Sequence, residues 1–209
     1  MVIADEPLVQ TETRQYLLGK TKAELISAIP RRETPKSTEN FFASLLGGGG
    51  NQSEDKPTLV FIHGSFHASW CWEEHYMPYF ASQGHPCVAL SLQGTGGTPT
   101  NEEGARKVKI SSHIADLDAL LRGLSDGDSS LGFGLGESPQ IVLVGHSFGG
   151  LTIMKWLEKF YESEKSQSIN LVGVALMCSV PPSGNVSDLD CARHAKTFSR
   201  IVLTITPII

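Results

Sequence analysis

The chain has 209 residues, which is enough for one domain with a sizeable buried core and a terminal extension. Its 40% hydrophobic and 19% charged residues are typical of a globular protein and exclude an intrinsically disordered chain. A formal net charge of -5 argues against nucleic acid or an anionic membrane surface as a partner.

Few features of the sequence bear on its compartment. No apolar run is long enough to span a bilayer, and residues 1–7 lack the basic and then apolar layout of a secretory signal. Four cysteines without metal-ligand spacing favour free thiols in a reducing compartment: Cys71, Cys87, Cys178 and Cys191. We therefore expect a cytoplasmic protein or one of an organelle stroma, with a plastid location open if the N-terminus is incomplete. The oligomeric state stays open.

Residues 1–57 form the first predicted region, a flexible N-terminal extension. Within it, residues 15–29 have the spacing of a short amphipathic helix that Pro30 ends, with these residues on one side: Leu18, Leu25, Ile26 and Ile29. The stretch 31–57 is polar and contains a glycine spacer at 47–50. We expect this whole region to be loosely attached.

Residues 58–185 form the predicted core, in which apolar runs alternate with helical patterns. Strands are expected over 58–64, 86–92, 140–145 and 169–178, and helices over 71–84, 109–124 and 150–162. The second helix should have a serine cap and bury Ile114, Leu117, Leu121 and Leu124; the third should bury Leu151, Met154, Leu157 and Phe160. This alternation predicts an α/β fold, a mostly parallel sheet with helices on both faces in three layers.

The string Gly145-His146-Ser147-Phe148-Gly149 stands between a predicted strand and a predicted helix. This is the setting of a nucleophile elbow, in which a tight turn needs small flanking residues and projects the serine hydroxyl above the sheet. The backbone of Ser147 should then be strained, and the N-terminus of the following helix favours a developing anion. A simple strand-to-helix turn with a serine cap is the alternative.

The stretch "FIHGSFHASWCW" follows the first core strand and should reach the same sheet edge. Acyl transfer needs two backbone donors aimed at the oxyanion, and we expect them to be the N–H groups of Ser65 and Phe148. Side chains expected to line or support the pocket are His63, Gly64, Phe66, His67, Trp70 and His146. For His63 and His67 singly, satisfied loop histidines are the simpler interpretation.

Two other glycine strings, at 93–98 and 132–137, lack the strand-before, helix-after context of a nucleotide loop, and we interpret both as ordinary loops. Asp116 and Asp118 should be solvated on a polar helix face.

Taken in order, "FIHGSFHASWCW", "SQGHPCVALSLQGTGGT" and "IVLVGHSFGG" resemble the α/β-hydrolase superfamily, in the AB hydrolase-1 type and its methylesterase and hydroxynitrile-lyase branch. The resemblance covers residues 58 to about 185. It implies Ser147 as nucleophile, Ser65 and Phe148 as oxyanion hole, no cofactor and no metal, and a small ester-type substrate. Hydroxynitrile-lyase chemistry is an alternative on the same scaffold.

The C-terminal region 186–209 departs from that family's pattern. The family's acid and base follow the serine in the order Asp or Glu and then His, and only Asp190 and His194 offer this order. Their separation of four positions cannot supply two strand-and-loop units, so the sequence predicts an apparently truncated chain with an impaired site. A catalytically inactive binding remnant is the alternative. If "RIVLTITPII" forms a strand, it should pair with the edge of the strand at 169–178.

Overall fold

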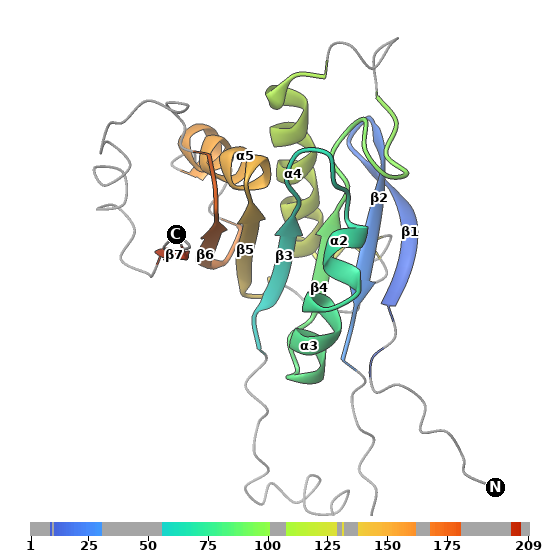
Figure 1. Cartoon of the computed structure of the whole chain (residues 1–209), viewed down its shortest axis with the longest axis vertical. Helices are drawn as coiled ribbons and strands as arrows, with labels where there is room; N and C mark the ends of the chain where they lie inside the picture. The colour runs from blue at the N-terminus through green and yellow to red at the C-terminus, as the bar shows by residue number, and fades with distance from the viewer. Residues whose placement is uncertain are drawn as a thin grey trace, which may run out of the picture.

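A computed structural model describes residues 9, 11–30, 56–100, 108–128, 131, 138–161 and 168–180, together with the backbone of 202–205. One seven-stranded sheet has the order β1-β2-β4-β3-β5-β6-β7 (Figure 1). Strands β3 (Thr58–Ile62), β4 (Cys87–Leu90), β5 (Ile141–His146), β6 (Leu171–Met177) and β7 (Val202–Ile205) are parallel to one another. The predicted α/β architecture with a mostly parallel sheet is therefore confirmed.

The N-terminal region forms a β-hairpin, so the predicted helix over 15–29 is wrong. β1 (Thr11–Leu18) and β2 (Thr21–Ala28) pair antiparallel around Gly19, whose φ of 59° suits a glycine. Tyr16 and Leu18 are buried while Leu17 is exposed, a period of two that the apparent helical spacing concealed. β2 also pairs antiparallel with β4, so this part of the extension belongs to the sheet and is not loosely attached.

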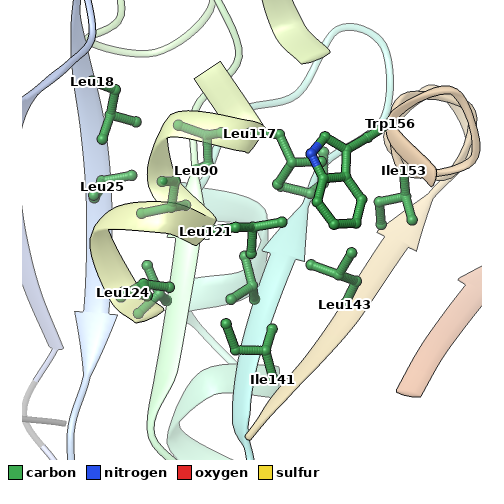
Figure 2. Close-up of a cluster of buried hydrophobic side chains, with 14 of the residues drawn as sticks. Leu18, Leu25, Leu90, Leu117, Leu121, Leu124, Ile141, Leu143, Ile153 and Trp156 are labelled. Carbon is green, nitrogen blue, oxygen red and sulfur yellow. The ribbon is translucent and has the colours of Figure 1, made fainter. Parts of the chain in front are cut away.

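Alternating side chains of the sheet feed two separate hydrophobic cores. Val60 and Ile62 of β3 join one cluster, whereas Leu59 and Phe61 join the other. The first cluster lies under α4 (Ile110–Ser125) and α5 (Phe148–Trp156), and Figure 2 shows side chains of both helices meeting over the strands. The second lies under α2 (Trp70–Glu73) and α3 (Tyr76–Ser82). Helices thus cover both faces, as the sequence predicts.

Three local details of the helices differ from the prediction. The helix expected over 71–84 is divided at 74–75 into α2 and α3, and Gly84 with φ 91° follows the second. The helix α4 begins after Lys109 without a side-chain cap, so the expected serine cap is wrong. Its inward residues are as predicted, namely Ile114, Leu117, Leu121 and Leu124.

The buried face of α5 is rotated relative to the expected one. Thr152, Ile153 and Trp156 are fully buried, while Leu151, Met154 and Leu157 are only partly buried, and the side chain of Phe160 is outside the described residues. The helix begins directly at Phe148, which fixes the phase, and it continues as a π-helical turn over Leu157–Tyr161. An indole N–H from Trp156 donates to Asp118 Oδ1 at 3.1 Å and ties α5 to α4.

Part of the stretch "RIVLTITPII" does form a strand, β7. It pairs in parallel with β6, Val174 opposite Val202 through Met177 opposite Ile205. Within the described parts of the chain, no helix has the length and apolarity needed to cross a membrane.

Candidate active site

Ser147 occupies a sharp turn between β5 and α5. Its backbone angles, φ 52° and ψ −115°, lie outside the regions that L-residues favour, and it is one of four non-glycine residues with positive φ in the described chain. The serine is the N-cap residue of α5, yet its side chain makes no capping hydrogen bond. The turn therefore has the strained geometry that the elbow prediction requires, and the hydroxyl is not used as a helix cap.

Glycines make this turn possible because they let three backbones approach closely. A Cβ added at Gly149 would lie 2.2 Å from the Ile62 carbonyl oxygen. One added at Gly145 would lie 2.8 Å from the Cα atom of Gly150. No side chain fits at either position, so the two flanking glycines of the motif have a steric explanation.

The loop after β3, residues 63–69, packs against the elbow, and we call it the His-Gly loop. A Cβ added at Gly64 would lie 3.1 Å from Ser147 Cβ and 2.9 Å from His146 Nδ1. The serine and the loop that contains Ser65 are therefore in van der Waals proximity. Among the described residues, the Ser65 N–H donates to no protein acceptor, and the first N–H groups of a helix such as α5 have none within it.

His63 is a buried structural residue of this loop. It is 1% exposed, and its Nδ1 lies 2.7 Å from the Gly64 carbonyl oxygen. Its Nε2 accepts the Leu92 N–H at 3.0 Å and lies 3.1 Å from Thr95 Oγ1. The pKa of His63 is lowered mainly because the ring is buried, and the charge on His67 lowers it further. A neutral imidazole with Nδ1–H thus joins the end of β3 to the end of β4, which fits the satisfied-histidine interpretation.

The side chains of the other expected pocket residues are exposed or partly buried. Phe66 is 99% exposed with φ 63°, and His67 is exposed with Nδ1 2.9 Å from the Ser65 carbonyl oxygen. The ring of His67 lies 6.3 Å from that of His146 and 5.7 Å from that of Trp70, centroid to centroid. Because His146 directly precedes Ser147, the contact between the His67 and His146 rings brings the His-Gly loop next to the serine, which is itself partly buried.

A histidine that the sequence analysis did not select also lies next to the elbow. His113 of α4 is 7% exposed, and its ring meets that of Phe148 edge-on, with centroids 5.7 Å apart. Its Nδ1 has no partner among the described residues. Burial, assisted by the nearby His63, lowers the pKa of His113 to about 4. No spacing along the chain indicates this contact, because it arises from the packing of α4 on α5.

The segment after β6 supports the elbow from the opposite side. The Ser147 N–H donates to the Met177 carbonyl at 3.0 Å, and the Val180 N–H donates to the Ser147 carbonyl at 3.4 Å. The strained serine is therefore bonded on both backbone sides to one neighbouring segment, which holds it in place.

The candidate triad partners Asp190 and His194 lie outside the described residues. Within the described ones, the Ser147 hydroxyl has no hydrogen-bonded histidine.

Asp116 is not solvated, contrary to expectation: it is 4% exposed and accepts from Thr21 Oγ1 at 2.6 Å and Gln93 Nε2 at 2.7 Å. Burial raises its pKa against the opposing effect of those hydrogen bonds.

A parallel sheet covered on both faces, with a strained serine at the turn from β5 to α5, defines the α/β-hydrolase class of protein architecture. The chain belongs to the alpha/beta hydrolase family, whose model matches residues 59–205.

Plant esterases are among its curated relatives. It is 30% identical to Methylesterase 1 of Arabidopsis thaliana over 54% of this chain and 38% of that protein. It is 32% identical to Methylesterase 8 of the same plant over 77% of this chain and 52% of that protein. The chain thus matches about half or less of these relatives' length. Among solved structures, potato (Solanum tuberosum) epoxide hydrolase I superposes with a TM-score of 0.56 at 17% identity, covering 91% of this chain and 46% of that one. That likeness concerns the fold alone.

Proposed function

We propose that this chain carries the nucleophile and the oxyanion-binding groups of a serine hydrolase that acts on a small ester. The observation that carries the proposal is the strained backbone of Ser147 at the β5–α5 turn, in contact distance of the His-Gly loop. The esterase names of several relatives support the choice of an ester as substrate class.

In the proposed reaction, Ser147 Oγ attacks the ester carbonyl carbon and the carbonyl electrons move onto oxygen. The Ser65 and Phe148 N–H groups donate to that oxyanion, and the positive end of α5 favours its charge. Collapse of the intermediate expels the alcohol and leaves an acyl-serine, which water hydrolyses. The hydroxyl proton passes to water during the attack, and water returns a proton to the departing alkoxide.

Proton removal is the weak step of this scheme. Because no histidine is bonded to the Ser147 hydroxyl in the described chain, we propose that turnover is impaired and rests on the oxyanion hole and substrate binding. Proteases stripped of triad members keep about 10³- to 10⁴-fold acceleration over water. A catalytically inactive binding protein is the second candidate, and the same missing bond favours it.

Labelling with an alkyl fluorophosphonate tests the proposal on the purified chain. The serine oxygen displaces fluoride from phosphorus, and the adduct is located by mass spectrometry. We expect labelling at Ser147 in the wild type and loss of labelling in Ser147→Ala. The control is Ser111→Ala, a matched change at an exposed serine of α4, and it should be labelled as strongly as the wild type. Equal labelling of the wild type and Ser147→Ala contradicts the nucleophile assignment.

Hydrolysis of p-nitrophenyl acetate separates the two candidate functions. A slow turnover that Ser147→Ala abolishes supports the impaired hydrolase. Labelling of Ser147 without any turnover supports the binding protein instead.

A further inference from the structure

The N-terminal hairpin places one carboxylate between the His-Gly loop and the loop that follows β4. Because β2 runs antiparallel to β4, Glu24 lies opposite Ser91, the first residue after β4, and the Ser91 N–H donates to the Glu24 carbonyl at 3.0 Å. The partly buried side chain of Glu24 then points between two loops: the His-Gly loop, and residues 91–98, which we call the β4 loop.

The Glu24 carboxylate accepts three hydrogen bonds from these loops. Oε1 accepts from Ser91 Oγ at 2.7 Å and from Ser69 Oγ at 3.1 Å. Oε2 accepts the Gly97 N–H at 2.9 Å. The Ser69 N–H also donates to Ser91 Oγ at 2.9 Å, and both serines are fully buried. Hydrogen bonds to a charged acceptor are stronger than those between neutral groups.

The glycine string of the β4 loop fits around this carboxylate. A Cβ added at Gly96 would lie 2.5 Å from Glu24 Oε1, and one added at Gly97 would lie 2.5 Å from Oε2. Thr98 Oγ1 accepts the Glu24 N–H at 2.8 Å and donates to the Ser91 carbonyl at 2.8 Å. The sequence predicts an ordinary loop here, and the structure gives its glycines a steric reason: they leave space for Glu24.

The β4 loop in turn holds the His-Gly loop. The Leu92 N–H donates to His63 Nε2, and the other ring nitrogen of His63 bonds to the Gly64 carbonyl, which precedes the Ser65 amide in the chain. The carboxylate thus reaches the backbone around Ser65 by two routes, one through Ser69 and one through Leu92 and His63.

We infer that Glu24 is a positioning residue for the oxyanion hole: it fixes the backbone of the His-Gly loop so that the Ser65 N–H faces the position above Ser147. This inference rests on the proposed function, because it assigns a purpose to the Ser65 amide. Glu24 touches neither substrate nor nucleophile and acts through Ser69, Ser91 and His63.

Glu24→Gln is the variant of choice, since it keeps the shape, removes the charge and leaves one acceptor oxygen, to which the Gly97 N–H and the two serine hydroxyls can no longer all donate. Ser91→Ala, which removes only the bridging hydroxyl, serves as the second variant if Glu24→Gln fails to fold. Glu12→Gln is the matched control, a carboxyl-to-amide change in the same hairpin at an exposed residue paired with Arg14.

Two measurements on the whole chain decide the matter. In labelling by the fluorophosphonate, Glu24→Gln should lower the maximal rate constant about tenfold and leave the half-saturating probe concentration unchanged, because the oxyanion donors act in the transition state. Amide hydrogen exchange should accelerate at Ser69 and Leu92 and stay unchanged at Val144 in β5. Glu12→Gln should match the wild type in both.

Unchanged exchange at Ser69 and Leu92 in Glu24→Gln overturns the inference, and so does unchanged exchange at Leu92 in Ser91→Ala where Glu24→Gln does not fold. Faster exchange with an unchanged labelling rate also overturns it, because the loop would then be held without consequence for the serine. A wild-type chain that is not labelled at all refutes the proposed function, and the exchange data alone then decide whether Glu24 holds the loop.

Discussion

The elbow after β5 and the His-Gly loop after β3 lie at the same edge of the sheet, yet different contacts hold their backbones in place. The elbow is fixed by steric fit at Gly145 and Gly149, two glycines within the motif itself, in addition to the two backbone hydrogen bonds of Ser147. The His-Gly loop is fixed by polar bonds to residues far away in the chain, such as Leu92 and Glu24. Close packing tolerates no added atom, whereas a polar network loses its bonds one at a time, so the two regions should respond differently to substitution.

The largest effect is expected in the elbow. Gly149→Ala introduces a Cβ that clashes with the Ile62 and His63 carbonyl oxygens, and we expect it to destabilise the fold by about 3 kcal/mol, at the upper end of overpacking effects. Urea denaturation measures this. Gly173→Ala in β6 is the control, because a Cβ added there would lie 3.4 Å from its nearest neighbour, Val142 Cγ2, which is an ordinary contact distance. Equal midpoints for the two variants would show that the elbow is not tightly packed.

A smaller effect should come from protonation of His113, which touches the elbow through Phe148. Its pKa is about 4 in the folded chain and near the ordinary 6.5 when unfolded, so the unfolded state binds the proton more tightly. Stability is then complete above pH 6.5 and is lost as the pH falls from there toward 4, by about 2 kcal/mol at pH 5. In His113→Leu, the urea midpoint should fall less between pH 7.5 and pH 5 than it does in the wild type. Parallel curves for the two proteins would contradict this assignment.

Removal of one polar contact between the β4 loop and the His-Gly loop should destabilise the fold less. Thr95→Val removes a hydroxyl that lies 2.5 Å from the Leu92 carbonyl oxygen and 3.1 Å from His63 Nε2, and we expect a loss of about 1 kcal/mol, typical of one hydrogen bond. The urea midpoint should fall, and exchange at Leu92 should accelerate. An effect as large as that of Gly149→Ala would remove the contrast between the two loops.

The smallest effect is expected for the surface ion pair of β1. Glu12→Gln breaks an exposed contact with Arg14 and should leave the stability almost unchanged. Urea denaturation at low and at physiological salt measures it. A clear loss of stability would mean that the hairpin depends on its surface charges as well as on its buried face.

The same contrast decides how much the sequence could predict. The buried runs of β3, β4, β5 and β6 are local, and so are the glycines around Ser147, so both the sheet and the elbow follow from short stretches. The sequence predicts a helix where the hairpin lies because four apolar residues match a helical period, and the alternation of Tyr16 and Leu18 is too short to outweigh it. Only pairing with β4 decides between the two.

The contacts of Glu24 and His113 could not be predicted from one chain. Glu24 meets Ser69 and Gly97 across 45 and 73 positions, and no motif joins them. His113 reaches Phe148 only because α4 packs on α5. The buried state of Asp116 escaped for the same reason, since its partners Thr21 and Gln93 come from a hairpin and a loop on other parts of the sheet.

The reversed direction of β2 has a consequence for how such a protein can change over evolutionary time. Parallel strands bring their final residues to the edge of the sheet where Ser147 lies, whereas an antiparallel neighbour brings its early ones, and Glu24 arrives there by that route. The residues that hold the loops at this edge and the serine itself therefore belong to separate stretches of sequence. Substitutions in the hairpin can therefore change how firmly the loops at this edge are held, and with them the proposed oxyanion hole, while the residues of the elbow stay unchanged.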